Sequence, residues 1–199
     1  MARKHSPDWF SKVKLTDLQK HPINSYNSHM IEEIMIQSFL NPDPHVFKFC
    51  IEHYSDKISE QKIHHNNWSH AVKQASEEHR ALFTILFQKM SRKNQKDILY
   101  SSIEYKDHEL SQLFTNLLSA DISPPHLLRH AVVHKNTKMA KFYMNAYPQS
   151  IAEAATMIGH SSYVQIHAYW HKIHAEYQKK ILEKSIGTAT THTKKISKI

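Results

Sequence analysis

Short amphipathic segments with the 3.6-residue period of an α-helix follow one another along most of the chain, and this periodicity restricts the fold more than any other feature. Residues that start or stop a helix separate these segments. Examples are Ser6-Pro7-Asp8, Asn41-Pro42 and Ser123-Pro124-Pro125. A capping side chain followed by proline favours the first turn of a helix, whereas proline cannot continue one. The sequence therefore predicts an all-α protein.

Scarcity of glycine excludes several other architectures. Only two of the 199 residues are glycine, whereas a phosphate-binding loop or a dinucleotide-binding fingerprint needs two or three within a short span. Folds with many β-hairpin turns also use more glycine than this. The single cysteine, Cys50, excludes an internal disulfide and a multi-cysteine zinc site. No apolar run approaches the roughly 18 residues that a membrane span needs, so no transmembrane segment is expected.

The predicted helices group into five short pairs. The first core residue of the second helix in each pair marks the position of that pair in the sequence. These residues are predicted to be Val46, Leu82, Leu110, Met139 and Tyr163, and they are unevenly spaced. A mean recurrence of roughly 30 residues is typical of a solenoid, in which each pair covers the apolar face of its neighbour. An irregular helical bundle is the alternative. We predict a solenoid of about five stacked helix pairs in residues 28–183, closed by a longer C-terminal capping helix.

The two ends of the chain differ from this array. Residues 1–27 are predicted to form an N-terminal cap around Trp9, Phe10, Val13 and Leu18. From Lys184 onward the sequence is small, polar and basic, which predicts a disordered tail over residues 184–199. The first residues lack the apolar core of a secretory signal, and the chain has only one cysteine. We therefore expect a cytoplasmic location.

Residues 123–146, SPPHLLRHAVVHKNTKMAKFYMNA, resemble an ankyrin repeat. They have a Ser-Pro start, a histidine soon after, an alanine in the first helix and a short polar turn before an apolar second helix. Residues 67–90 resemble the pattern less closely, and residues 151–170 retain the turn between two helices at Gly159-His160. The chain departs from the family in three ways. Its inter-helix glycine is present only at Gly159, His126 lies about one turn too early, and several units are shorter than the usual length of about 33 residues.

The resemblance covers residues 65–170 and implies a degenerate ankyrin-like array that binds partner proteins without catalysing a reaction. Such arrays, when poor in glycine and rich in lysine, histidine and asparagine, look like effectors of intracellular bacteria. This likeness implies delivery into the cytosol of a host cell. A different family of helix-pair repeats is the alternative.

Protein recognition is therefore the predicted function, through the side of the array that the first helices and the inter-helix turns form. Polar and charged side chains on one predicted first helix, and on the turn before it, would contact an acidic or mixed partner surface. The candidate partner-binding residues are Lys106, Asp107, His126, Arg129, His130 and His134.

Basic charge offers an alternative function. Lysine and arginine number 26 against 18 acidic residues, a formal net charge of +8, but only the C-terminal end is locally dense in lysine. A basic segment of this kind binds nucleic acid or acidic phospholipid with a strong dependence on salt. The residues that would carry this binding are Lys179, Lys180, Lys194, Lys195 and Lys198.

Histidine offers a second alternative, because the chain contains 18 of them. His167, His171 and His174 lie on one narrow stripe of the predicted last helix, and histidines at i and i+4 can share a metal ion. The glutamate that acts as a base in helical zinc proteases is absent, and the stripe borders an apolar face where histidines also pack. Cys50, with His53 one turn away, is predicted to be a buried thiol rather than a nucleophile. Neither catalysis nor a cofactor is predicted.

Overall fold

The computed structural model describes residues 6–20, 26, 30–59, 68, 71–72, 75–118 and 121–196. Every regular element among these residues is helical, which confirms the all-α prediction. None of the helices in this part of the chain combines the length and the apolarity needed to cross a membrane. The chain divides into two compact units, Met1–Asp121 and Ile122–Ile199.

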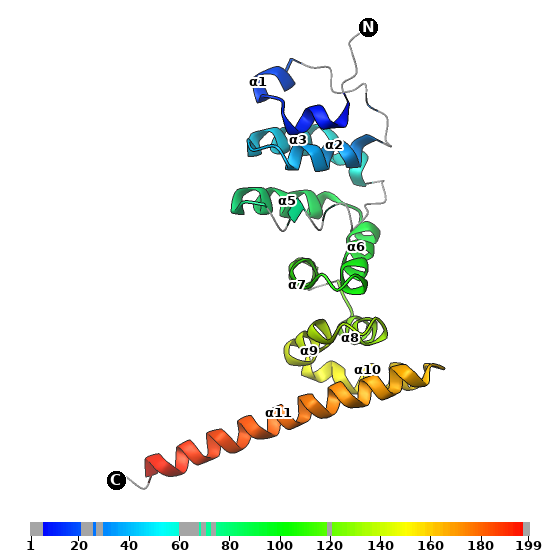
Figure 1. Cartoon of the computed structure of the whole chain (residues 1–199), viewed down its shortest axis with the longest axis vertical. Helices are drawn as coiled ribbons and strands as arrows, with labels where there is room; N and C mark the ends of the chain where they lie inside the picture. The colour runs from blue at the N-terminus through cyan, green and yellow to red at the C-terminus, as the bar shows by residue number, and fades with distance from the viewer. Residues whose placement is uncertain are drawn as a thin grey trace. The chain divides into compact units, whose positions relative to one another are not determined.

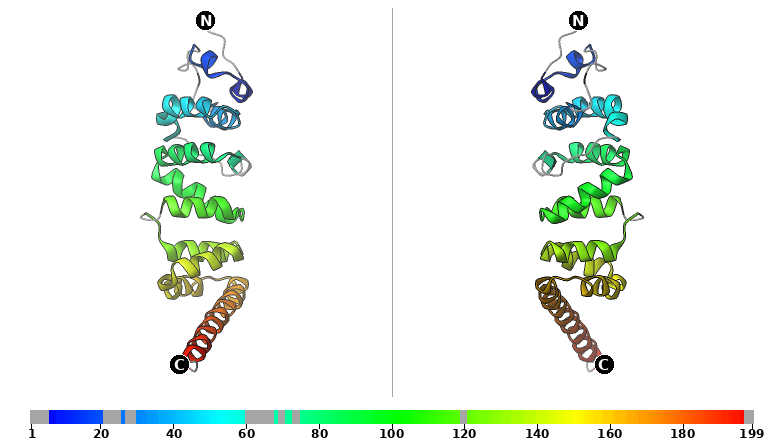
Figure 2. Two further views of the ribbon diagram at one scale, coloured as in Figure 1. Left: turned by 90° about the vertical axis from the view of Figure 1, so that its left-hand side faces the viewer. Right: turned by 90° about the vertical axis from the view of Figure 1, so that its right-hand side faces the viewer.

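The first unit is built from helices that follow each other in sequence and pack together. Its elements are η1 (Pro7–Ser11), α1 (Leu15–Leu18), α2 (Ile31–Phe39), α3 (Pro44–Ser59), α5 (Glu77–Lys89), α6 (Arg92–Glu104) and α7 (His108–Leu117). Helix α2 packs along α3, and α6 packs along α7. Figure 2 shows α2 and α3 side by side. The predicted pairing of short helices is therefore present in this unit.

Aromatic rings connect successive helices of the first unit. Phe39 of α2 lies against Trp68 with ring centroids 5.6 Å apart, and Trp68 lies 5.0 Å from Phe83 of α5. Phe83 in turn contacts Phe114 of α7 at 6.0 Å, and all four rings are buried. Aromatic pairs contribute about 0.5–1.5 kcal/mol beyond the burial of their area. These contacts tie α2, α5 and α7 into one core.

Residues near the N-terminus cover the end of this core. Phe10, Val13 and Leu18 are buried, while Trp9 is half-buried. Element η1 packs on α2, and α1 packs on α3. The Asn41 side-chain amide donates to the carbonyls of Phe10 (2.9 Å) and Val13 (3.0 Å), which fixes this segment. Residues 1–5, 21–25 and 27 of the predicted cap lie outside the described residues.

The second unit places a very long helix against three short ones. Its elements are α8 (Pro124–Val133), α9 (Thr137–Ala146), η4 (Pro148–Ser150), α10 (Ile151–Gly159) and α11 (Val164–Ile196). Helix α8 packs on α9 and α10, and α11 contacts all three. Figure 1 shows α11 continuing well beyond them towards its red C-terminal end. The predicted longer C-terminal helix is therefore present.

Helix α11 extends further than the sequence predicted. The backbone is helical to Ile196, whereas the composition from Lys184 onward predicted a disordered tail. Gly187 costs about 1 kcal/mol in this segment, and the four threonines that follow it are also weak helix formers. Packing of the first turns removes the nucleation cost, so each further residue needs only the free energy of propagation. Residues 197–199 lie outside the described part of the chain.

Three helix pairs bury side chains at the same relative positions. In α2–α3 these shared positions are Ile34, Met35, Ser38, Phe39, Val46, Phe47, Cys50 and Ile51. In α6–α7 they are Ile98, Leu99, Ser102, Ile103, Leu110, Ser111, Phe114 and Thr115. In α8–α9 they are Leu127, Leu128, Ala131, Val132, Met139, Ala140, Tyr143 and Met144. One packing pattern is therefore repeated with different side chains.

The structure corrects two of the predicted first core residues. In α5 this position is held by His79, which is buried, whereas Leu82 is only half-buried. The His79 ring Nε2–H donates to the Asn41 carbonyl (3.0 Å), and in the neutral ring Nδ1 accepts from the Ser76 hydroxyl (2.9 Å). Because both ring nitrogens are satisfied, a histidine can occupy this core position. Tyr163, the other corrected residue, is 69% exposed.

Candidate functional site

The turns that join α6 to α7 and α8 to α9 have the same backbone structure. Lys106 and Lys135 have left-handed φ values of 59° and 51°. The Asn136 N–H donates to the Ala131 carbonyl (2.8 Å), and the Asp107 N–H makes the equivalent bond to Ser102 (2.8 Å). This is the Schellman arrangement, in which glycine normally takes the left-handed position. Gly159 does not take this role, because it ends α10 and has no positive φ.

Each of these turns ends in a buried side chain that caps the second helix. Asn136 Oδ1 accepts from the Met139 N–H (3.1 Å), and Asp107 Oδ1 accepts from the Leu110 N–H (3.4 Å). Asp107 is only 4% exposed. Its carboxylate is therefore a structural cap, which corrects its predicted place on the partner-binding surface.

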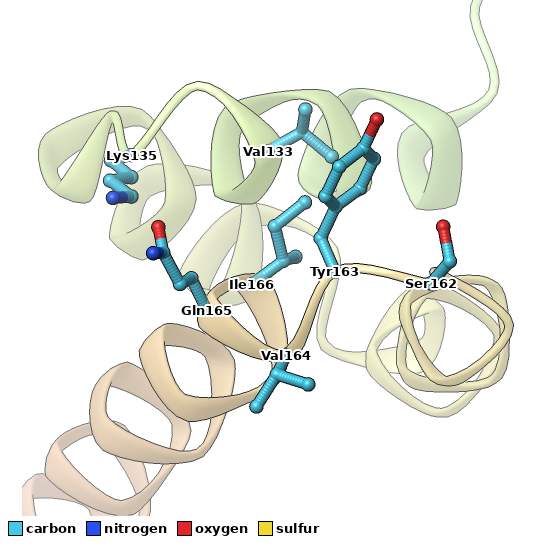
Figure 3. Close-up of a pocket in the computed structure, with 7 residues that line it drawn as sticks. All are labelled: Val133, Lys135, Ser162, Tyr163, Val164, Gln165 and Ile166. Atoms are coloured by element: carbon cyan, nitrogen blue, oxygen red, sulfur yellow. The ribbon is translucent and has the colours of Figure 1, made fainter.

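A pocket of about 520 Å³ lies between the α8–α9 turn and the start of α11. We call it the Tyr163 pocket; its lining residues are Val133, Lys135, Ser162, Tyr163, Val164, Gln165 and Ile166. In Figure 3 the side chains of Tyr163 and Ile166 point towards Val133 on α8, whereas that of Val164 points away from it. Tyr163 is 69% exposed and Val164 is 81% exposed. The pocket thus combines apolar surface with the side chain of Lys135.

Backbone and side-chain hydrogen bonds hold the turn that carries Tyr163. The ring Nε2 of His167 lies 2.7 Å from the Ser161 carbonyl, to which it donates. The Ile166 N–H donates to the Tyr163 carbonyl (3.0 Å), and the Tyr163 N–H reaches the Ser161 hydroxyl (3.4 Å). Tyr163 is therefore presented from a fixed turn, which lowers the entropy lost when a partner binds.

Three polar contacts fasten α11 across α9. The hydroxyls of Thr137 and Tyr169 lie 2.8 Å apart, and the Tyr177 hydroxyl donates to the Met144 carbonyl (3.0 Å). Lys141 Nζ lies 2.7 Å from Glu176 Oε2. The hydrogen bond and the charge of Lys141 lower the pKa of the Glu176 carboxyl. These contacts keep the wall of the Tyr163 pocket that α11 supplies in place.

The predicted partner-binding residues on α8 and at its C-terminal end are at least partly accessible, and the last of them, His134, is a sequence neighbour of two residues that line the Tyr163 pocket. His126 and Arg129 are exposed, and His126 Nδ1 lies 2.7 Å from the Ser123 hydroxyl. His130 and His134 are half-buried, with ring centroids 4.4 Å apart. His134 lies between Val133 and Lys135, two residues that line the Tyr163 pocket.

The remaining candidates are one predicted residue and two that were not predicted. Lys106 is exposed, but it belongs to the unit Met1–Asp121. Tyr163 and Val164 are contributors that the sequence did not reveal, because Tyr163 was predicted to be a core residue and Val164 was not singled out. The pair Ser161-Ser162 before them was the available signal for a turn.

The candidate metal ligands on α11, all of them described residues, are not assembled. The ligand atoms of His167, His171 and His174 are not gathered within 4.8 Å of one another. His167 is engaged by the Ser161 carbonyl, and the His174 ring stacks on Trp170 at 4.9 Å.

Cys50 is a buried thiol, as predicted. It is fully buried, and this burial raises the pKa of its thiol to about 12, although the Ser38 hydroxyl partly opposes the shift. The thiol therefore stays protonated and unreactive.

The basic residues of the last helix are partly described. Lys179 and Lys180 are exposed on α11. Lys194 and Lys195 belong to the final turns of the same helix, and Lys198 lies outside the described residues.

Comparison with known proteins adds no identification. The chain matches no protein-family model, and neither a curated protein nor a solved structure is detectably similar to it.

Proposed function

We propose that this chain is a non-catalytic protein-binding module, an ankyrin-like array of helix pairs that binds its partner at the Tyr163 pocket and along the exposed side of α8. The observation that carries the proposal is the exposure of Tyr163 (69%) and Val164 (81%) on a hydrogen-bonded turn beside Lys135. Tyrosine is one of the residues most enriched among the dominant contacts of protein interfaces. The exposed Tyr163 ring and the Lys135 side chain, which line the same pocket, suit a partner segment with an apolar side chain and a carboxylate.

The repeated burial pattern supports the array. With His79 as the first core residue of α5, the corresponding residues of the second helices are Val46, His79, Leu110 and Met139. These residues recur in nearly equal steps of roughly 30 residues, close to the length of an ankyrin repeat. The spacing is more even than the sequence indicated. Repeat arrays of this kind commonly bind other proteins through an extended surface.

The left-handed lysine in the turn also supports a binding role. Glycine would adopt the backbone of Lys135 without a steric penalty, whereas lysine incurs one. Strain of this kind is concentrated at functional positions. A lysine there presents a positive charge at the rim of the Tyr163 pocket.

The test is an affinity capture with the full chain from nuclease-treated cell extract, at low and moderate salt, read by mass spectrometry. The test variant combines Tyr163→Ser with Val164→Ser, and the matched control is Ile85→Ser, which removes a comparable exposed apolar side chain (44%) from α5. Loss of a tyrosine at the centre of an interface costs about 2 kcal/mol or more, which corresponds to about a thirtyfold weaker complex.

We expect a discrete protein that wild type and the Ile85 variant retain at both salt concentrations and that the double variant loses. A partner retained equally by the double variant would refute the Tyr163 pocket as the binding site. Capture that disappears at moderate salt for every variant would instead favour the basic residues of α11 as a nucleic-acid or phospholipid surface.

A further inference from the structure

A second, larger groove lies further along α11 than the Tyr163 pocket. It has a volume of about 830 Å³ and runs between the middle of α11 and the segment that joins α9 to α10. Tyr177, Ile181 and Leu182 line it from α11, and Pro148 and Ile151 line it from the other side. We call it the α11 groove. Its long wall is one face of a helix, which suits a rod-shaped ligand.

The apolar residues of this groove have helical spacing and are accessible. Ile181 is 44% exposed and Leu182 is 61% exposed, and Ile186, one turn beyond Leu182, is 58% exposed. Tyr177 and Ile181 lie one turn apart, as do Leu182 and Ile186, and the two pairs are adjacent on the helix, so together they form a broad apolar stripe. Such a stripe is the usual recognition surface for an amphipathic helix.

Charge around the stripe determines which helix fits. Between Tyr177 and Ile186, α11 carries three lysines, Lys179, Lys180 and Lys184, against one glutamate, Glu183. Glu176 is paired with Lys141, and Glu183 lies 4.0 Å from Lys179. The flanks of the stripe therefore carry a net positive charge. A second copy of α11 laid along the first would place lysines against lysines, whereas a helix with acidic flanks would be attracted.

We infer that the α11 groove binds an amphipathic helix of another protein, with an apolar face seated on Ile181 and Leu182 and with glutamate or aspartate on its flanks. Pro148 and Ile151 form the second wall, so the ligand is held between two sides. A membrane surface presents a flat interface and would leave this second wall unused. The inference concerns a different surface from the Tyr163 pocket, so either can fail without the other.

The experiment uses the full chain and two synthetic, fluorescein-labelled peptides, each long enough for about five helical turns. Both carry leucine at i, i+3, i+4 and i+7 positions; one has glutamate on the flanks and the other has lysine. Binding is measured by fluorescence anisotropy at about 0.15 M salt, where charges within about 8 Å of each other still interact. The disruptive variant is Leu182→Asp, and the control is Ile85→Asp, a substitution on α5. Circular dichroism checks that both variants are folded.

We expect the glutamate-flanked peptide to bind wild type and Ile85→Asp alike. Exchanging its flanks for lysine, or introducing Leu182→Asp, should each weaken binding about tenfold or more. Absence of binding, equal binding of both peptides, or binding unaffected by Leu182→Asp would overturn the inference. So would a concentration-dependent dimer, seen by light scattering, that Leu182→Asp abolishes. Displacement of the peptide by phosphatidylserine vesicles, but not by phosphatidylcholine vesicles, would assign the groove to a membrane surface instead.

Discussion

Replacing Lys135 by glycine is expected to stabilise the protein. The lysine has a φ of 51°, and a side chain in the left-handed region costs about 1–2 kcal/mol because its Cβ approaches the neighbouring carbonyl oxygen. Glycine lacks the Cβ but loses about 0.5–1 kcal/mol more backbone entropy on folding. The Lys135 side chain is exposed, so its removal sacrifices little packing. The balance is a gain of about 1 kcal/mol in the free energy of unfolding.

Two control substitutions isolate the backbone effect within the same unit. Lys135→Ala removes the same charge but keeps the Cβ, so it should leave the free energy of unfolding almost unchanged. Lys172→Gly removes an exposed lysine from the interior of α11, where glycine costs about 1 kcal/mol. In thermal unfolding followed by far-ultraviolet circular dichroism, Tm should rise by about 2–4 °C for Lys135→Gly and fall for Lys172→Gly.

The reasoning would be refuted if Lys135→Gly were no more stable than Lys135→Ala. That result would mean that the left-handed turn is not strained, and the argument that links its lysine to binding would lose its basis. A weaker partner complex in the stabilised Lys135→Gly variant would instead show that the charge is retained for recognition.

Three further predictions concern the core, the caps and the buried thiol. Phe114→Ala removes a ring that stacks on Phe87 at 4.6 Å, and it should cost about 3–5 kcal/mol in urea unfolding. Asn136→Ala should cost about 1 kcal/mol in thermal unfolding because it removes the cap of α9, whereas Asn136→Asp should retain most of the stability. Cys50 should react with a thiol reagent at mildly alkaline pH only after unfolding. Because its pKa is 9.0 when exposed and about 12 in the fold, the folded state holds the proton more tightly, so stability should fall as pH rises from 9.0 towards 12. The free energy of unfolding should fall by up to about 1.4 kcal/mol per pH unit in wild type and by less in Cys50→Ala. An equal pH dependence of the two proteins in urea unfolding would contradict this prediction.

Much of the helical organisation could be predicted because it depends on neighbours in the chain. Proline at helix starts, as at Pro44 and Pro124, and the polar turn around Asn136 act within one or two turns of helix. The same local signals placed the exposed residues His126 and Arg129 on the first helix of a pair. They also predicted that the last helix is the longest.

The inward positions of the array were less predictable, because burial depends on elements far away in sequence. Hydrophobicity selected Leu82 as the first core residue of α5, but the structure buries His79 there because the Asn41 carbonyl, much earlier in the chain, accepts from its ring. Hydrophobicity likewise assigned Tyr163 to the core, although it remains 69% exposed in its unit. The candidate site was missed for that reason.

Short-range effects alone make this chain helical and specify where its helices begin and how they are joined, since capping, proline stops and helical periodicity act between near neighbours. Two features arise only on packing: the burial of Asp107, and the accessibility of Tyr163 and of the stripe around Leu182. Each depends on which surfaces meet when the helices come together. Those contacts are set by the whole unit rather than by the segment that carries the residue.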